Sequence, residues 1–316
     1  MPKVRIGVYL PQIGVDYRTL REVAVESERL GLDSVWATDH MLPYHGDLKR
    51  PYLECWTVIS ALAEITERLR LGTFVLCNLF RYPQVLAKMV ATLDVISGGR
   101  FDLGIGAGWL KEEFEAYGIP FPKPSVRISM LREALEIMKR MWVEEEPSFS
   151  GEHYSIRGAV CEPKPIQKPH PPIWIGSLTG GRLIYETIAE HANGWVIGTL
   201  YFPSPEEYSS KVEEIRGYLS KFNRGIEDLK RGLGVACLLA EDDDELREKK
   251  KKYGPITVSS GRYEATQKLI YATPDEFVEI LSPYVDLGVE LFVIYLPDVT
   301  TLRPLRLLSE KVIPSL

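Results

Sequence analysis

Asp39 and His40 stand side by side at the end of the apolar run SVWATDH, residues 34–40. Histidine is the side chain best suited to proton transfer near neutral pH, because imidazole changes its charge in that range. The pair therefore suits a reaction site in which His40 accepts or donates a proton. It equally suits a structural hydrogen bond at the end of a strand, so both interpretations stay open at this stage.

Other residue types that suit a ligand follow similar apolar runs. Tyr44 lies on the loop after His40, where its ring could stack on a planar ligand or simply pack against its neighbours. Glycines let a ligand approach the backbone, and the amides that open a following helix bind phosphate. Turn residues of this kind are Gly106, Ala107, Gly108, Gly176, Ser177, Gly180 and Gly181. Such turns are common, so they support a ligand site only together with other residues.

Eight β-rich runs recur along the chain, with helix-period segments between them. The runs are near-continuous apolar stretches, which is typical of parallel strands covered on both faces. They occupy residues 4–10, 34–40, 69–78, 101–108, 172–177, 194–199, 233–240 and 291–297. This alternation predicts a single (β/α)8 barrel domain over 1–316, since no G-x-G-x-x-G motif follows the first run to favour an open sheet. Asp39 and His40 then lie at the carboxyl end of the second strand, where barrel active sites are built.

Two insertions interrupt the alternation. Residues 143–171, before the fifth strand, are rich in Pro and turn formers and predict a hairpin followed by an irregular segment. Residues 241–273, after the seventh strand, open with the charged run EDDDELREKKKKYG and are far longer than an ordinary connection. We expect this second insertion to form a mobile cover over the barrel mouth, interrupted at Gly254, Pro255 and Gly261.

The composition is that of a globular enzyme with a large core, since 45% of the residues are apolar and 26% are charged. A formal net charge of -6 without a clustered basic patch argues against nucleic-acid binding and favours a small organic molecule as partner. No apolar run reaches the roughly 18 residues that cross a bilayer, and no signal peptide is recognisable, so we expect a cytoplasmic protein without a membrane partner. The four scattered cysteines predict buried side chains and no metal site.

Four stretches of the sequence resemble the bacterial-luciferase-like group of flavin- and deazaflavin-dependent oxidoreductases. They are VWATDH, LGTFVLCNLFRYPQVLAKMVATLDVISGGRFDLGIGAGW, KEEFEAYGIPF and KPIQKPHPPIWIGS. The resemblance covers nearly the whole chain, and the last stretch is most similar to members that use coenzyme F420, a deazaflavin. It implies a (β/α)8 barrel, in agreement with the strand pattern, and a homodimer.

The resemblance also implies which residues contact coenzyme F420. It places Asp39 near the polar edge of the deazaflavin ring and His40 near the reacting face, as the candidate catalytic residues. Tyr44 takes the place of a tryptophan in the F420-dependent sugar-phosphate dehydrogenases. Phe74 and Val75 match a pair joined by a cis peptide bond, whose bulge supports the ring from behind. The other matched positions are Cys77, Ala107 and Gly108, which match contacts to the cofactor, and Gly180, Gly181, Leu183 and Ile184, which match the segment that holds its phosphate.

One departure from this pattern concerns the substrate. The sugar-phosphate dehydrogenases carry a catalytic glutamate where this sequence has Trp109, so we expect an incomplete acid/base pair and a substrate less polar than glucose 6-phosphate. Arg182 is a candidate cation for the anionic tail of a deazaflavin. The preferred hypothesis is an F420-dependent oxidoreductase in which His40 moves the proton that accompanies hydride transfer. The alternatives are a luciferase-like monooxygenase that uses FMN and a non-catalytic flavin-binding protein.

Overall fold

A closed barrel of parallel strands forms the centre of the computed structural model, which describes residues 4–177, 180–254, 256–260 and 263–316. The barrel strands are β1 (Arg5–Tyr9), β2 (Ser34–Ala37), β3 (Arg70–Thr73) with its continuation β4 (Leu76–Cys77), β5 (Phe101–Gly106), β8 (Ile173–Gly176), β9 (Gly194–Ile197), β10 (Lys230–Leu239) and β14 (Leu291–Tyr295). Each pairs with the next, and β14 pairs with β1, so the sheet closes on itself. The predicted (β/α)8 fold is confirmed, and the strands overlap all eight predicted runs.

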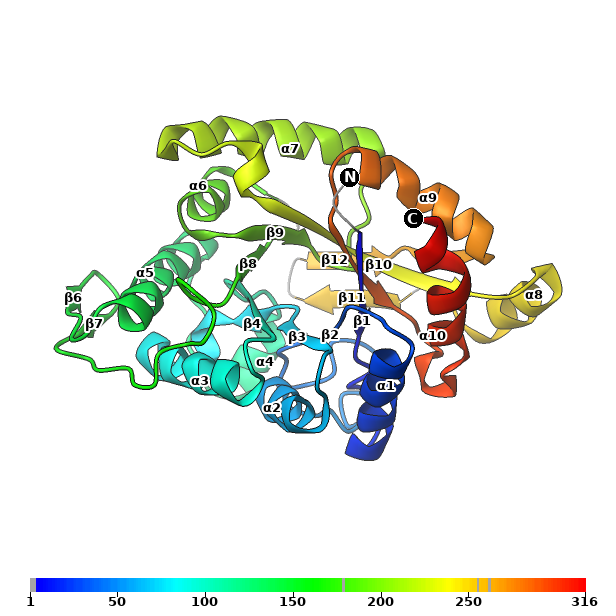
Figure 1. The fold of residues 1–316 in the computed structure, drawn as a ribbon, viewed down its shortest axis with the longest axis horizontal. Helices are drawn as coiled ribbons and strands as arrows, with labels where there is room; N and C mark the ends of the chain where they lie inside the picture. Colours follow the sequence, from blue (N-terminus) through cyan, green and yellow to red (C-terminus); the bar gives the residue numbers. More distant parts are fainter. Residues whose placement is uncertain (1–3, 178–179, 255, 261–262) are drawn as a thin grey trace.

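Helices surround the barrel, as the end-on view of Figure 1 shows. The first, α1 (Tyr17–Arg29), buries Leu20 and Val23 on one face. It begins after Asp16, whose carboxylate accepts a hydrogen bond from the Thr19 amide and so satisfies one of the free amides of the first turn. The other α-helices are α2 (Cys55–Ile65), α3 (Pro83–Ile96), α4 (Lys111–Ala116), α5 (Pro124–Val143), α6 (Arg182–His191), α7 (Pro205–Leu219), α8 (Asp243–Lys252), α9 (Pro274–Asp286) and α10 (Arg303–Leu307).

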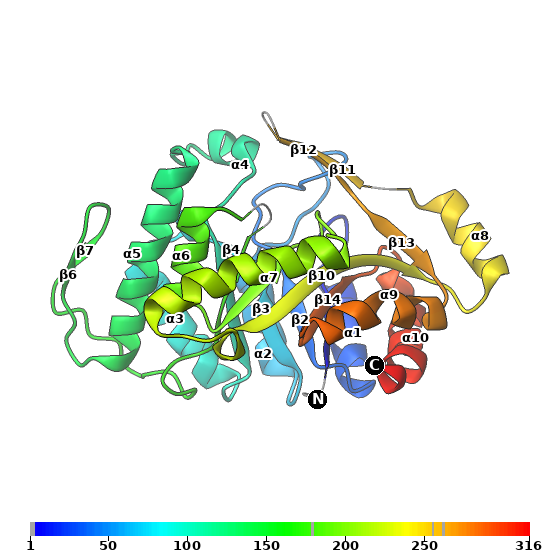
Figure 2. The same cartoon turned by 90° about the horizontal axis from the view of Figure 1, so that it is seen from above.

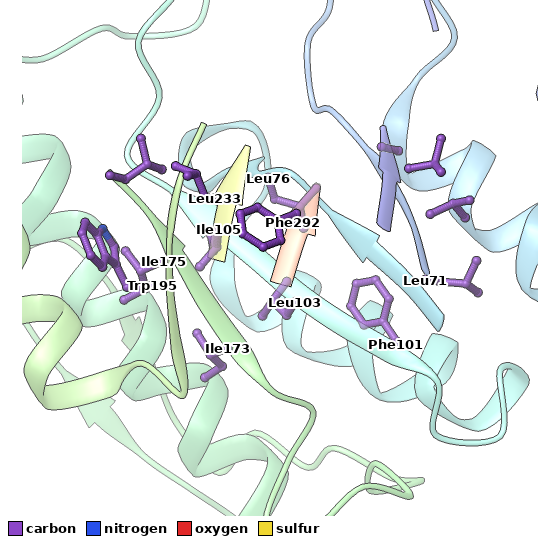
Figure 3. Packing of buried hydrophobic residues seen from close by; sticks show 14 of the residues in the cluster. Leu71, Leu76, Phe101, Leu103, Ile105, Ile173, Ile175, Trp195, Leu233 and Phe292 are labelled. Atoms are coloured by element: carbon purple, nitrogen blue, oxygen red, sulfur yellow. The ribbon is translucent and has the colours of Figure 1, made fainter. Parts of the chain in front are cut away.

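The larger part of the core lies between the strands and the surrounding helices. Figure 3 shows a portion of it, in which Leu103 and Ile105 on β5 lie close to Ile173 and Ile175 on β8. All four side chains are fully buried. Continuous burial of both strand faces explains why the strand sequences are apolar runs without a clean alternation.

A smaller cluster of side chains fills the barrel interior. Trp36 on β2 and Trp174 on β8 meet there edge to face, with ring centroids 6.3 Å apart. Glycines on neighbouring strands make room for these rings, because a Cβ at Gly72 would collide with Trp36 and one at Gly194 would collide with Trp174. The interior is therefore a packed core, and the space for a ligand lies above it.

The two insertions form small additions to the barrel. The first contains the predicted hairpin, made by β6 (Phe149–Ser150) and β7 (Ser155–Ile156). The second contains α8, the hairpin of β11 (Ile256–Ser260) and β12 (Tyr263–Gln267), and β13 (Leu269–Ala272), which was not predicted and pairs in parallel with the far end of β10.

The hairpin of the second insertion lies at the same end of the barrel as α4 (Figure 2). Pro255 and Gly261, two of the predicted interruptions, lie outside the described residues. The role of this insertion as a mobile cover stays a prediction.

All four cysteines are buried, as predicted, and none forms a disulfide bond within the described residues. Within the described ranges, no helix combines the length and the apolar character needed to span a membrane.

His191, near the end of α6, makes acid stability testable. Neither of its buried ring nitrogens has a hydrogen-bond partner among the described residues. Burial, together with the charge of Lys139, lowers the pKa of His191 from 6.5 to about 3. The unfolded chain therefore binds a proton that the fold excludes, so stability is lost as the pH falls from 6.5 towards 3.

At pH 4.5 the unprotonated state of His191 lowers the free energy of unfolding by about 3 kcal/mol relative to its value at neutral pH. The variant His191→Leu should therefore lose less unfolding free energy than the unmodified protein between pH 7 and pH 4.5. Urea unfolding at both pH values measures the difference. An equal loss in both proteins would show that His191 does not set the acid sensitivity.

Candidate active site

A cavity of about 490 Å³ lies at the carboxyl ends of the barrel strands, a volume suited to a small organic ligand. It brings together most of the predicted site residues. Those that line it are Asp39, His40, Tyr44, Phe74, Val75, Cys77, Ala107, Gly108, Gly180 and Ile184. Two other predicted contacts, Gly181 and Leu183, lie outside the described lining, and Leu183 is 43% exposed.

His40 forms a pair with Glu113, a residue that sequence reasoning missed. The His40 Nδ1 atom lies 3.0 Å from Oε1 and 3.2 Å from Oε2 of Glu113, and the Met41 amide donates to Oε2 at 2.9 Å. The Glu113 side chain is 2% exposed and belongs to the first turn of α4. An ionised carboxylate only accepts hydrogen bonds, so with Glu113 ionised Nδ1 is the donor and Nε2 is the ring nitrogen that remains for a substrate.

Three aromatic rings lie around His40. The ring centroids of Tyr44, Trp109 and Tyr52 lie 5.0, 5.7 and 6.3 Å from that of His40. The prediction of an incomplete acid/base pair, made from Trp109, stays a prediction. Glu113, four residues beyond Trp109, supplies a carboxylate to the Nδ1 side of the His40 ring.

Asp39 is engaged through both of its carboxylate oxygens. Arg81 donates to Oδ2 at 2.7 Å and to Oδ1 at 3.0 Å, and the Cys77 amide donates to Oδ2 at 2.9 Å. Burial raises the pKa of Asp39, while Arg81 and the Cys77 amide oppose this rise. Arg81 also contacts Glu54 at 2.5 Å, so one guanidinium joins two carboxylates. These bonds fix the turn after β2 against β4, which favours a positioning role for Asp39 over proton transfer.

The peptide bond between Phe74 and Val75 is cis, as predicted. Both residues line the cavity, and Val75 lies against the ends of β5 and β8. A Cβ at Gly106 would come within 3.0 Å of a Val75 methyl group, and one at Gly176 within 2.9 Å. Glycine at these two strand ends therefore leaves room for the Val75 side chain in the cavity wall.

The segment before α6 is suited to binding an anion. Gly180 and Gly181 have φ values of 76° and 109°, which favour glycine. A Cβ at Gly180 would also collide with the hydroxyl of Tyr185. Gly181 precedes the helix without a side-chain cap, so the first amides of α6 keep their capacity to donate to a phosphate.

Two arginines differ in their access to the cavity. Arg127, which sequence reasoning missed, lines it and lies 4.0 Å from the ring centroid of Phe121. It donates to the Pro122 carbonyl at 2.6 Å, its Nε atom has no partner among the described residues, and burial lowers the pKa of Arg127. Arg182, the predicted cation, is 76% exposed and lies 3.4 Å from Glu186. Among the described lining residues, Arg127 is therefore the cation inside the cavity.

The relationship of the chain to known proteins agrees with this geometry. Residues 3–282 match the model of the family described as luciferase-like monooxygenases. The chain belongs to this family. The resemblance noted from the sequence is therefore confirmed.

Several luciferase-like relatives match this chain over almost its whole length. The F420-dependent glucose-6-phosphate dehydrogenase of Microbacterium testaceum is 31% identical over 320 residues, which cover 94% of this chain and 93% of that protein. The enzyme of the same name from Amycolatopsis mediterranei is 27% identical over 322 residues, with 95% and 94% covered. Among solved structures, an F420-dependent secondary alcohol dehydrogenase superimposes with a TM-score of 0.83 at 19% identity, over 99% of both chains. The last comparison shows a shared fold.

Three polar residues of this luciferase-like site escaped prediction. Glu113 opens a helix directly after a barrel strand, and its position at the active-site end of the barrel could have indicated it. Arg81 follows β4 at the same end of the barrel, so its position could have indicated it in the same way. Arg127 lies within the long helix α5, where no local pattern distinguishes it from a surface arginine.

Proposed function

We propose that the protein is a coenzyme F420-dependent oxidoreductase that transfers a hydride between the deazaflavin and a small organic substrate. The observation that carries this proposal is the pair of His40 and Glu113 in the wall of the cavity, because a carboxylate of this kind orients an imidazole for proton transfer. Relatives that are 27% and 31% identical over almost the whole chain are named as F420-dependent dehydrogenases, which favours this cofactor.

The described residues fit a planar ring with an anionic tail. Gly106, Gly108 and Gly176 line the cavity and leave room in its wall for the side chains of Val75, Cys77 and Phe114. A planar ring would therefore lie against small and apolar groups there. The Nε atom of Arg127 is a buried donor without a partner among the described residues. Together with the uncapped amides at the start of α6, this guanidinium suits a phosphate group.

Coenzyme F420, when bound, supplies the hydride chemistry. The Nε2 atom of His40 accepts a proton from a substrate that is oxidised, or donates one to a substrate that is reduced. Glu113 holds the imidazole through Nδ1 and stabilises its protonated form. Tyr44 and Trp109 line the cavity beside His40 and exclude water from the reacting atoms. Asp39 contributes by fixing the turn that carries His40.

The aromatic wall bears on the choice of substrate. Trp109 contributes an apolar surface at the position where the sugar-phosphate dehydrogenases are expected to carry a glutamate. A sugar hydroxyl would find no carboxylate at that position, so we infer a substrate less polar than glucose 6-phosphate.

The cofactor is tested by comparing coenzyme F420 with FMN. We expect coenzyme F420 to bind more tightly, because its longer anionic tail gains further contacts with cations and amides beyond the first phosphate. Fluorescence titration gives both dissociation constants, and mixing each reduced complex with oxygenated buffer gives the rate of oxygen consumption. The reduced F420 complex should react slowly with oxygen. Tight FMN binding with fast oxygen consumption would identify an FMN-dependent monooxygenase instead.

The remaining properties are also proposed from the sequence and the family resemblance. We infer one catalytic domain over 1–316, a homodimer in the cytoplasm, and a small organic molecule rather than nucleic acid or a membrane as partner. The net charge of -6 supports the exclusion of nucleic acid. Light scattering on the purified protein tests the dimer.

A further inference from the structure

A second cavity, of about 400 Å³, adjoins the active site. The two cavities share the wall formed by Tyr9, Thr38 and Tyr44. The hydroxyls of Tyr9 and Tyr44 lie 2.8 Å apart, and the Tyr44 ring also contacts His40. A molecule that reacts beside His40 therefore has a second space of ligand size directly beyond Tyr44.

The charged side chains in the described lining of this second cavity are positive. Its described lining includes Arg50 and Lys252 but no Asp or Glu. The active-site cavity differs, because Asp39 and Glu113 line it. Cations without a carboxylate among them produce a positive potential that favours an anion.

Arg50 is held in place by the neighbouring loop. Its guanidinium donates to the Ile13 carbonyl at 3.3 Å. Gly14, with a φ of 71°, allows this approach, since a Cβ there would collide with the guanidinium. The Gly14 amide donates to the Pro51 carbonyl at 2.8 Å, and Ile13 forms a β-bridge with Tyr52. The segment at Ile13 and the segment at Arg50 are therefore held together by backbone contacts. This limits the motion of Arg50 and lowers the entropic cost of binding a ligand there.

His45 gives a second and independent indication of a ligand. It lines the same cavity, and its buried Nε2 atom has no hydrogen-bond partner among the described residues. Burial and then Arg50 lower the pKa of His45, so its imidazole is neutral and can donate or accept a hydrogen bond. Tyr9 and Tyr295, which pack edge to face at 5.2 Å, add an aromatic wall suited to a planar carbon framework.

We propose that this second cavity binds the carboxylate-bearing aromatic end of the organic substrate, while the other end of the substrate reacts beside His40. Arg50 is the main partner of the carboxylate, with Lys252, which is exposed like Arg50, and the half-buried His45 as further partners. This assignment of the ligand as substrate rests on the proposed function, whereas binding of an aromatic anion does not depend on the cofactor.

The test uses benzoate as the probe and benzamide as its neutral counterpart, each titrated calorimetrically into the full chain. We expect benzoate to bind more tightly than benzamide. The variant Arg50→Gln should weaken benzoate binding about tenfold, the effect of losing one charge-assisted hydrogen bond, and leave benzamide unchanged. Lys49→Gln is the matched control, because Lys49 precedes Arg50 on the same loop and does not line the cavity. If the Arg50 variant does not fold, Lys252→Gln is tested in its place. We expect it to weaken benzoate binding by less than about tenfold.

Equal binding of benzoate and benzamide, or an Arg50 variant with unchanged benzoate affinity, would overturn the proposal. The titrations are repeated with coenzyme F420 present, and benzoate should bind with a similar dissociation constant, because it is expected to occupy the second cavity and to leave the cofactor's positions free. Loss of benzoate binding in the presence of the cofactor would place the probe in the cofactor site and also overturn it. Failure of coenzyme F420 to bind, with the Arg50 effect intact, would instead remove the proposed function and leave an anion site.

Discussion

Replacement of His40 by asparagine is expected to lower turnover by about 100-fold or more, because it removes the group that moves the proton. Asparagine is chosen because its amide can take the place of Nδ1 and still donate to Glu113, whereas Nε2 is lost. Alanine would lose the same proton carrier, and would also leave the Glu113 carboxylate, 2% exposed, with the Met41 amide as its one donor among the described residues. The asparagine variant should therefore keep a melting temperature close to that of the unmodified protein.

A double-mutant cycle with Glu113→Gln separates the role of Glu113 from that of His40. If Glu113 acts by orienting the imidazole, this variant lowers turnover in the unmodified protein but has little further effect in the His40→Asn background. Turnover is followed by the absorbance change of the deazaflavin, and pH–rate profiles are compared. Full turnover of the His40→Asn variant would show that His40 does not move the proton and has a structural role.

Replacement of Asp39 by asparagine is expected to cost about 3 kcal/mol of unfolding free energy, because it breaks a buried ion pair by removing one partner. The Asp39 and Arg81 side chains are 1% and 13% exposed. Asparagine has nearly the same shape, but its amide group would face the guanidinium or the Cys77 amide, both of which are donors. Arg81 would keep its ion pair with Glu54, whose side chain is 37% exposed, but would lose the buried carboxylate that faces it.

The matched control is Asp33→Asn, which breaks an ion pair with Arg5 of similar length, 2.9 Å. The side chains of this second pair are 21% and 26% exposed, and Arg5 keeps its contact with Asp102 at 3.1 Å, so the expected cost is below about 1 kcal/mol. Urea unfolding of both variants at neutral pH measures the two costs. Equal losses would mean that the pair of Asp39 and Arg81 does not stabilise the turn after β2 more than a surface pair would.

The barrel could be predicted because its signals are local. A continuous apolar run such as residues 291–297 indicates a strand that is buried on both faces. A segment with apolar residues at the helical period indicates a helix with one buried face. The same reasoning missed β13, a strand of four residues that follows the hairpin of β11 and β12. It forms because β10 extends past its pairing with β9 and offers free backbone groups to Leu269–Ala272. Nothing within those four residues signals that partner.

The sequence by itself determined that Asp39 and His40 follow a barrel strand, and therefore that they lie at the end where ligands bind. Only the tertiary structure decided their partners: Glu113, 73 positions from His40, and Arg81, 42 positions from Asp39. Local patterns specify burial and strand direction, whereas such contacts depend on how α4 and the turn after β4 pack across the barrel mouth. The fold makes His40 the residue with a ring nitrogen left for the substrate, and it occupies both oxygens of Asp39 because Arg81 and the Cys77 amide meet there.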